Sequence, residues 1–235
     1  MHIFNANELR HICASTVPIF KTLSYRELQK VNGLIRKKDY QKGNVLFLQG
    51  DRSDHLYIVR YGRVKIYEVS KDGRQQIVRI LEQGDFFGEL SLFKDEHHSL
   101  NGEAMEDTGL CMIPREDFKI LVKENPEMSI SIMAALSERL AAAENFIIDL
   151  TLKNIEERLA SWLMMMADKQ GIRTAQGIEV SVNLSRREIA NLLGTTTETV
   201  SRKLTKFQTA GIITTEGHKN IIIRNKEKLS TIITD

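Results

Sequence analysis

Four polar residues in the C-terminal part of the chain have side chains that can read the edges of DNA bases. They lie in the stretch TETVSRKLTKF, which begins at Thr197 and ends at Phe207. An arginine can give two hydrogen bonds to guanine, a glutamate can accept one from cytosine, and a serine can do either. Apolar residues at helical spacing predict that Val200, Leu204 and Phe207 pack inward. The candidate base-contacting residues on the other face are Thr197, Glu198, Ser201 and Arg202.

The residues around this helix have the spacing of a helix-turn-helix. Ser185 can cap a first helix, with Glu188 three residues later as its partner in a capping box. Gly194 can end that helix because glycine adopts positive φ at little cost, and Thr196 or Thr197 can cap the second helix. Such a pair fits the major groove of DNA; the alternative is an ordinary solvated helix pair. The candidate contacts to the DNA backbone are Ser185, Thr196, Lys203 and Lys206.

The composition is that of an ordinary folded protein. Of the 235 residues, 42% are hydrophobic and 27% are charged, with a net charge of +2. The two cysteines, Cys13 and Cys111, are too few for a disulfide scaffold. No apolar run approaches the roughly 18 residues of a membrane helix, and the N-terminus lacks the apolar stretch of a signal peptide. We therefore expect a cytoplasmic protein that does not associate with membranes.

The sequence does not suggest an enzyme. It contains no spacing typical of a nucleophile and its base, no metal-binding motif and no phosphate-binding loop. We therefore expect no catalytic residues, no metal site and no cofactor.

Two changes of periodicity divide the chain. The stretch LSYRELQKVNGLI (23–35) has a helical pattern with Ser24 as its N-cap. Regularly spaced glycines and short β-rich runs follow, with a hairpin signal at Asp72 and Gly73. The runs are VLFL, LYIV, VKIYEV and QQIVRIL. Such strands suggest a β-sandwich or barrel, which we end near Pro114.

A long stretch without glycine or proline, from Glu127 to Gln170, predicts a long helix. Apolar residues at heptad spacing form a narrow seam in it. The seam consists of Met133, Leu136, Leu140, Ala143, Ile147 and Leu150. We expect two copies of the chain to pair along this seam, and Asn154, at the next seam position, to mark where their helices part. The alternative is a helix that packs on its own β-domain.

The last part of the chain has the outline of a winged helix. The stretch NIEERLASWLMMMA (154–167) predicts a helix whose methionine-rich face lies in the core. The helix-turn-helix follows. The stretch GIITTEGHKNIIIR (211–224) predicts a hairpin that turns near Gly217 and closes the chain.

These segments together resemble the CRP/FNR family of transcription regulators over nearly the whole chain. The motifs that carry the resemblance are GDFFGELSLF (84–93), NIEERLASWL (154–163) and TTTETVSRKLTKF (195–207). The family implies an α+β fold with an N-terminal β-roll like a cyclic-nucleotide-binding jelly roll, a long dimerisation helix and a C-terminal winged helix-turn-helix. The expected divisions are an N-terminal arm (1–22), a β-roll sensor (23–116), a dimerisation helix region (117–152) and a DNA-binding domain (153–235).

The recognition helix resembles the FNR branch of the family. Glu198, Ser201 and Arg202 match its E-x-x-S-R pattern, and Thr197 replaces the first arginine of the CRP branch. The resemblance implies a homodimer that binds an inverted repeat of TTGAT-like half-sites in double-stranded DNA. It also implies RNA polymerase as a partner.

The resemblance leaves the sensory input open. Cyclic-nucleotide-binding members have an arginine about ten residues after the Gly-Glu-Leu that here begins at Gly88. This chain has His98 or Ser99 there, and no arginine between Arg79 and Arg115. A neutral histidine is a poor phosphate clamp, so we expect the Gly-Glu pair to have a structural role in the turn.

The two cysteines give three further alternatives. In the FNR branch, three N-terminal cysteines and one in the β-roll hold an iron–sulfur cluster, and Cys111 in TGLCMIP matches the latter. Cys13 lies in the N-terminal segment, on an arm with few obvious anchors. Two thiolates cannot hold a four-cysteine cluster. The resemblance implies that the two segments are neighbours in the fold. Cys13 and Cys111 could therefore form a redox-sensing disulfide or remain inert thiols. With this cysteine set the chain most resembles the Flp-type FNR-like proteins of Gram-positive lactic bacteria.

Overall fold

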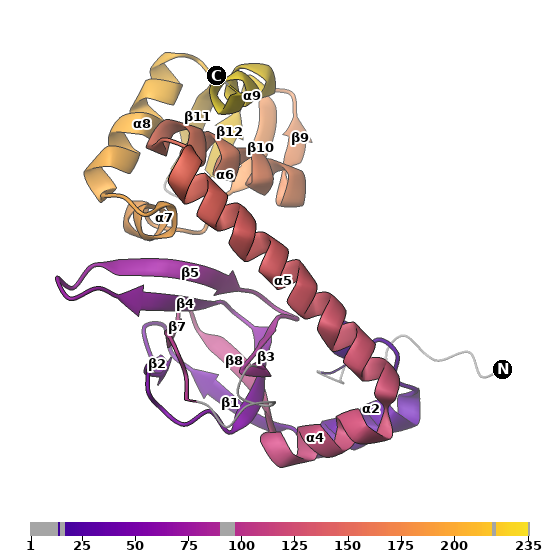
Figure 1. Cartoon of the computed structure of the whole chain (residues 1–235). Coiled ribbons are helices and arrows are strands. Elements are labelled where there is room, and N and C mark those ends of the chain that lie inside the picture. Colours follow the sequence, from indigo (N-terminus) through magenta and orange to yellow (C-terminus); the bar gives the residue numbers. More distant parts are fainter. Residues whose placement is uncertain (1–13, 15–16, 90–96, 218–219, 235) are drawn as a thin grey trace. The chain divides into compact units, whose positions relative to one another are not determined.

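The computed structural model describes residues 14, 17–89, 97–217 and 220–234 (Figure 1). The chain divides into two compact units. One unit comprises Met1–Glu68 and Val78–Ala141, and the other comprises Val69–Ile77 and Ala142–Asp235. The boundary falls within one long helix, α5 (Pro126–Leu152), which contributes residues to both units.

Two four-stranded β-sheets lie mostly in the first unit (Figure 1), although residues 69 and 75–77 of their strands belong to the second. One sheet has the order β1-β8-β3-β6 and the other the order β2-β7-β4-β5. Their strands are β1 (Arg36–Tyr40), β2 (Val45–Phe47), β3 (His55–Tyr61), β4 (Val64–Val69), β5 (Gln75–Leu81), β6 (Phe86–Phe87), β7 (Asn101–Ala104) and β8 (Thr108–Pro114). The four strands predicted from β-rich runs are confirmed, and the last strand ends at Pro114 as expected.

Side chains of the central strands alternate between two apolar cores. Val59 of β3 and Leu110 of β8 belong to a cluster between the sheets. Ile58 and Cys111, one residue away on each strand, belong to a second cluster that includes Phe118 of the helix α4 (Arg115–Glu124). Successive residues of a strand point to opposite faces, so Cys111 is directed away from the interior of the roll.

Helices close the second core. The helix α2 (Tyr25–Leu34) begins as predicted at Ser24, whose hydroxyl accepts from the Glu27 backbone N–H at 3.4 Å while the Glu27 carboxylate accepts from the Ser24 N–H at 2.6 Å. The expectation of a weakly anchored N-terminal arm is wrong for its described part. Ala14, Val17 and the short helix η2 (Pro18–Phe20) place apolar side chains in the same core as Cys111, because burial of apolar surface is favourable.

The helix α5 packs on its own unit along one face and exposes apolar residues elsewhere. Met128 and Ile132 are buried in the second core, and Leu136 of the predicted seam packs against it. Leu150 is half-buried, whereas Met133, Leu140 and Ile147 are 57%, 61% and 60% exposed in the single chain. Ala143 is also exposed. The helix therefore satisfies part of both expectations, because it packs locally and still presents apolar seam residues to solvent.

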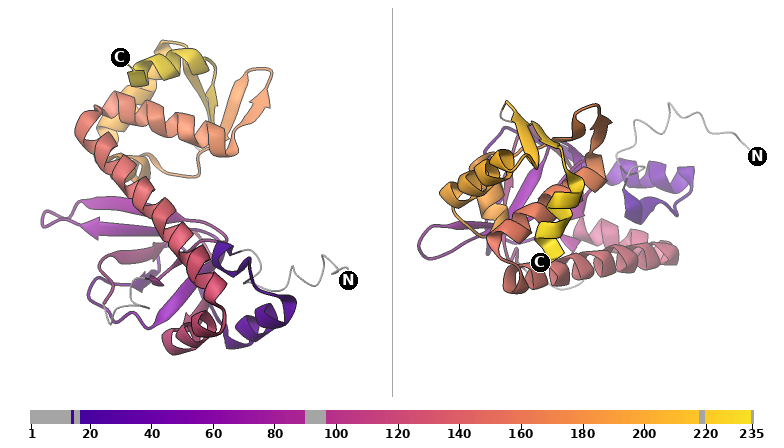
Figure 2. Two further views of the ribbon diagram at one scale, coloured as in Figure 1. Left: turned by 45° about the vertical axis from the view of Figure 1, so that its right-hand side comes forward. Right: turned by 90° about the horizontal axis from the view of Figure 1, so that it is seen from above.

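The second unit contains a four-stranded sheet and five helical segments, counting the end of α5, among the described residues. Its sheet has the order β11-β12-β10-β9. The elements after α5 are α6 (Ile155–Gln170), β9 (Ile172–Thr174), β10 (Gly177–Ser181), α7 (Arg186–Leu193), α8 (Thr197–Thr209), β11 (Ile213–Glu216), β12 (Asn220–Ile223) and α9 (Lys226–Thr234). Figure 2 shows α5 as one continuous ribbon that ends just before α6 begins.

Three expectations about this unit need correction. Asn154 lies outside α5 and is the N-cap of α6, so it is not a seam residue. The methionine-rich stretch of α6 is only partly covered: Met165 is 53% exposed and Met164 and Met166 are half-buried, because the helical period places Leu159, Leu163 and Ala167 on the buried side. The hairpin of β11 and β12 does not close the chain, because α9 follows it and buries Leu229.

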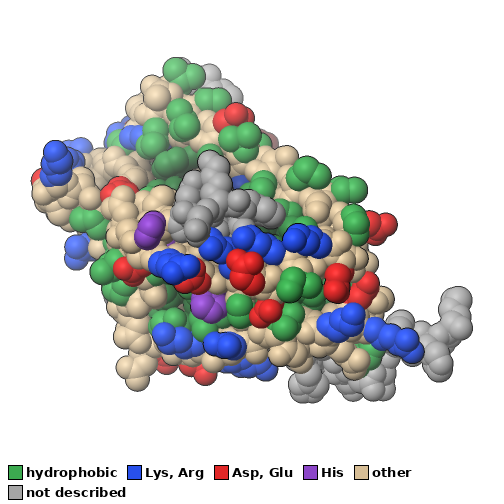
Figure 3. All heavy atoms as spheres, turned by 60° about the horizontal axis from the view of Figure 1, so that its bottom comes forward, with side chains coloured by type: hydrophobic (Ala, Val, Ile, Leu, Met, Phe, Trp, Pro, Cys, Tyr) green, Lys and Arg blue, Asp and Glu red, His purple; other side chains and the backbone are tan. Residues whose placement is uncertain are grey.

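Charged side chains of both signs are interspersed on the face shown in Figure 3. Apolar side chains are scattered between them. Within the part of the chain that the structure describes, no helix is long and apolar enough to cross a membrane.

Candidate nucleic-acid interface

Two short helices, α7 and α8, meet at a tight turn whose geometry follows from their sequence. Ser185 and Glu188 form the predicted capping box at the start of α7. Gly194 ends α7 with φ 66° and ψ 45°, the left-handed conformation that glycine adopts without a Cβ clash. Thr196 then caps α8 by accepting from the Thr199 N–H at 3.3 Å. Ala190, in α7, is also buried.

The helix α8 has one buried face and one exposed polar face. Val200, Leu204 and Phe207 are 0%, 2% and 1% exposed, so the predicted inward face is confirmed. Glu198, Ser201 and Arg202 are exposed, whereas Thr197 is half-buried. The side chains predicted to contact bases therefore lie on the solvent side of a helix that is fixed from behind by apolar packing.

The exposed face of α8 carries a carboxylate that favours its ionised form and a guanidinium, which are the charged groups that can read base edges. Hydrogen bonds from its own backbone N–H and from Thr196 lower the pKa of Glu198, and an ionised carboxylate only accepts hydrogen bonds. No ion pair within the described residues engages the Arg202 guanidinium, which keeps its fork of donors. The face thus offers an acceptor and a bidentate donor one turn apart.

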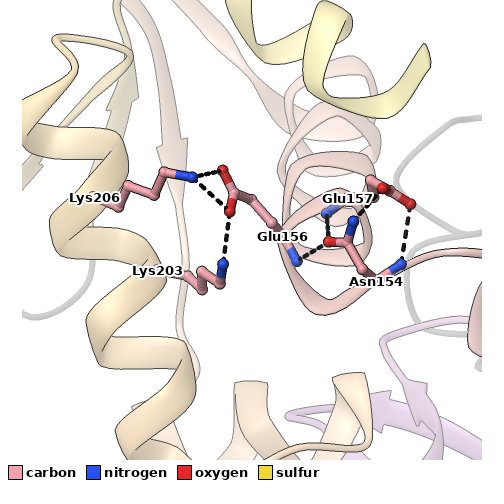
Figure 4. Close-up of polar contacts among 5 residues, drawn as sticks. All are labelled: Asn154, Glu156, Glu157, Lys203 and Lys206. Atoms are coloured by element: carbon pink, nitrogen blue, oxygen red, sulfur yellow. Dashed lines mark hydrogen bonds and ion pairs between the residues drawn. The ribbon is translucent and has the colours of Figure 1, made fainter. Parts of the chain in front are cut away.

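Two lysines predicted to contact the DNA backbone are held by a carboxylate of the same unit (Figure 4). Lys203 Nζ lies 2.6 Å from Glu156 Oε2, and Lys206 Nζ lies 2.6 Å and 2.8 Å from Glu156 Oε1 and Oε2. The hydrogen bonds from Lys203 and Lys206 lower the pKa of Glu156. Sequence reasoning missed Glu156, because no local pattern pairs residues 47 and 50 positions apart.

In the first unit, the Gly-Glu pair of the β-roll has the structural role that the sequence predicts. Gly88 has φ 87°, and a Cβ there would lie 2.5 Å from the His55 carbonyl oxygen. The Glu89 side chain is 5% exposed, and its Oε1 lies 2.6 Å from Arg139 Nη1 in α5 and 3.9 Å from Arg79 Nη1. The Arg139 guanidinium also lies over the Phe86 ring, 4.0 Å from its centroid. This turn is therefore tied to the first half of α5.

A small cavity lies beside this turn. Its described lining includes Phe47, Arg79, Glu89 and His98, and its volume is about 60 Å³. Small-molecule sites are usually several hundred Å³, so the described cavity is smaller than such a site. His98, which with Ser99 is one of the two candidates for the position where nucleotide-binding members have arginine, stacks on Phe47 with 3.7 Å between ring centroids, and burial lowers its pKa. A neutral imidazole in this position does not neutralise a phosphate.

The cysteine hypothesis falls partly outside the described residues. Cys13 lies outside the described residues, whereas Cys111 lies within them. Cys111 is 0% exposed in β8, and Ala14, the residue after Cys13, is buried in the same core. Among the described residues, no group of three or more His, Cys, Asp or Glu side chains is placed to hold a metal ion.

Comparison with known proteins assigns both units. A cyclic nucleotide-binding domain model matches residues 37–125, and a Crp-like helix-turn-helix domain model matches residues 157–232. The chain is 34% identical over 209 residues to the anaerobic regulatory protein of Aggregatibacter actinomycetemcomitans, covering 88% of this chain and 80% of that protein. It is 33% identical over 212 residues to the fumarate and nitrate reduction regulatory protein of Escherichia coli K12, covering 90% and 84%.

A solved structure of similar fold spans both units. A mutant of CooA from Carboxydothermus hydrogenoformans superposes with a TM-score of 0.80 at 27% identity, covering 93% of this chain and 95% of that one. The relatives match in both regions and over most of their own length. The chain therefore belongs to the CRP/FNR family of DNA-binding transcription regulators.

Proposed function

We propose that the protein is an FNR-like regulator that binds, as a homodimer, an inverted repeat of TTGAT-like half-sites. The observation that carries the proposal is the exposed E-x-x-S-R face of α8, formed by Glu198, Ser201 and Arg202. Arginine and glutamate discriminate guanine and cytosine by their donor and acceptor patterns. Ser185 and Thr196 lie at the N-termini of α7 and α8, where backbone N–H groups favour phosphate.

The exposed apolar residues of α5 support the homodimer. Met133, Leu140 and Ile147 are each more than half exposed in the single chain and recur at heptad spacing. A symmetric pair would bury these residues against each other. Two α8 helices could then read half-sites about 34–36 Å apart. The likeness of both units to transcription regulators also supports RNA polymerase as a partner, in the cytoplasm.

Titration against DNA of three sequences tests this function. The full inverted repeat, a single half-site and a scrambled duplex of equal length should bind in that order of affinity. The binding constant should fall steeply with salt, because phosphate contacts release counterions. Equal affinity for all three duplexes would contradict sequence-specific recognition. No binding to any duplex would favour a ligand-binding β-roll module without a direct DNA role.

We propose further that thiol oxidation modulates DNA binding through a Cys13–Cys111 disulfide. The observation that favours it is the burial of Ala14, the residue after Cys13, in the same core as Cys111. Relatives named for anaerobic regulation and for control of electron transport favour a redox-linked input. The two-cysteine set is also the basis for proposing closeness to the Flp-type proteins.

A small ligand in the β-roll is the second candidate input. Among the described residues, none is hydrogen-bonded to the buried Glu89 Oε2 beside the cavity, so a ligand with a hydroxyl or amine donor would satisfy it. Thermal unfolding with cyclic AMP, cyclic GMP and adenosine tests this candidate. Stabilisation by any of them, lost in Glu89→Gln, would support it, whereas an unchanged midpoint with all three would argue for thiol control or constitutive activity.

A further inference from the structure

Glu156 makes two ion pairs to the recognition helix from the first turn of α6. Its carboxylate binds Lys203 and Lys206, which lie one turn apart on α8. The Glu156 side chain is 16% exposed and that of Lys203 is 26% exposed, so this contact is shielded more than an ordinary surface pair. Charged hydrogen bonds in such a setting are stronger than neutral ones.

The positions of the two lysines on α8 explain what these contacts restrain. Ser201 and Lys203 are two residues apart, so their side chains point about 160° apart around the helix axis. Lys203 therefore lies behind the exposed face. Lys206 follows Arg202 by four residues and lies on the same flank one turn later. A carboxylate bound to both positions restrains rotation of α8 about its axis, in addition to the apolar packing of the helix from behind.

The first turn of α6 is itself pinned to the end of α5. Asn154 caps α6, and its side-chain oxygen accepts from the backbone N–H groups of Glu156 and Glu157 at 2.8 Å and 3.2 Å (Figure 4). Lys153 Nζ lies 2.7 Å from Asp149 Oδ1 in α5 and donates to Ser161 Oγ in α6 at 3.0 Å. Polar contacts thus join the last turn of α5 to α6, and the first turn of α6 to α8.

We propose that Glu156 is a positioning residue for the recognition helix: by holding Lys203 and Lys206, it sets the rotation at which α8 presents Arg202 and its neighbours. The inference rests on the proposed reading of an inverted repeat by α8. It also assigns Lys203 a partner inside the protein in place of a DNA phosphate.

The direction in which one substitution changes DNA affinity distinguishes a positioning role from competition for phosphate contacts. If the lysines served phosphates and Glu156 competed for them, Glu156→Gln would free two cations and strengthen binding to every duplex. If Glu156 positions α8, the same substitution weakens binding to the inverted repeat and leaves binding to scrambled DNA equal or stronger. The ratio of the two affinities should therefore fall, by about tenfold if the coupling is of the usual size.

The experiment measures this ratio for the parent, Glu156→Gln, Lys203→Met, the double variant and Asp168→Asn. Asp168 is the matched control, because it is in the same helix and pairs at 2.7 Å with Lys226 of α9, away from α8. Its substitution changes the net charge by the same amount and should leave the ratio unchanged. Circular dichroism and the midpoint of thermal unfolding show whether each variant is folded. If Glu156→Gln does not fold, Lys203→Met, which breaks the same ion pair, takes its place in the comparison.

A double-mutant cycle identifies the ion pair as the cause. If the Glu156–Lys203 pair acts as a unit, the double variant should lose no more specificity than either single variant. A Glu156→Gln protein with an unchanged or raised ratio, or an Asp168→Asn protein with the same loss, would overturn the inference. Failure of the parent to prefer the inverted repeat would instead overturn the proposed function, so the two failures are distinguishable.

Discussion

Arg202 is the residue whose loss should be most informative about base reading. Arg202→Ala removes a bidentate donor from the exposed face of α8, and we expect a loss of about 1–3 kcal/mol in binding the inverted repeat. Preference at one base pair should relax. Binding to a set of single-base variants of each half-site measures both effects. Arg173→Ala, which removes an exposed arginine from β9, is the control, and an unchanged specificity ratio in Arg202→Ala would contradict the role of this face.

Gly194 tests the turn between α7 and α8. Its φ of 66° lies where other residues are strained, so Gly194→Ala should lower the free energy of unfolding by about 1–2 kcal/mol. Chemical denaturation of the parent and the variant measures this difference. Gly33→Ala is a suitable control, because Gly33 is inside α2 with open space where a Cβ would be, and the substitution should not destabilise.

His98 makes the stability of the β-roll depend on pH. Burial lowers the pKa of His98 below its ordinary value of 6.5, so folding favours the neutral form. The stabilisation is complete above pH 6.5 and is lost as the pH falls through the folded-state pKa. We expect His98→Gln to lose less stability than the parent between pH 7 and pH 5, as measured by urea denaturation. A residual dependence should remain because burial also lowers the pKa of His55.

At the scale of elements, α5 should hold two copies of the chain together. Leu140 is 61% exposed in the single chain, so Leu140→Glu should leave the folded protomer intact. In a symmetric pair the new carboxylate would meet its own copy in an apolar seam, which is costly through both desolvation and repulsion. Sedimentation should therefore show monomers, and affinity for the full inverted repeat should fall to that for a half-site.

Ala142→Glu provides the control for this prediction. Ala142 is exposed, and at two residues from Leu140 its side chain points away from the seam. The variant adds the same charge to the same helix and should remain dimeric. A dimeric Leu140→Glu protein would show that the chain pairs along another surface.

At the scale of the whole molecule, oxidation of the thiols should change how the protein binds DNA. Oxidised protein should contain a Cys13–Cys111 link within one chain, and we expect it to bind the inverted repeat about 5–150-fold more tightly than reduced protein. Peptide mapping without reductant shows the link, and titration of both forms shows the change in affinity. Cys13→Ser should respond to neither oxidant nor reductant. It is preferable to Cys111→Ser, because Cys111 is buried in an apolar core.

The redox prediction would be contradicted if the oxidised parent lacked the disulfide, or if it bound DNA as tightly as the reduced form does. The protein would then respond to some other signal, or to none. The Glu89 cavity would then be the next candidate. Oxidation of a thiol requires access, and Cys111 is 0% exposed, so the rate of linkage should also report how often the core around β8 opens.

The sequence by itself determined the features that depend on neighbours a few positions away. The N-cap at Ser24, the capping box at Ser185, the positive φ of Gly194 and the inward face of α8 were all predicted, because caps, turns and helical periods are set within about four residues. The order of β-roll, long helix and helix-turn-helix followed from the same local periods and from the family resemblance.

Only the tertiary structure decided which residues far apart in the chain meet. Glu156 holds Lys203 from 47 positions away, Arg139 of α5 holds Glu89, and Cys111 faces the core that contains Ala14. The methionines of α6 were misplaced because apolar type alone does not say which face another element will cover. Such pairings arise when packing brings distant elements together, so the side chain that a charge or a thiol meets is a property of the folded chain.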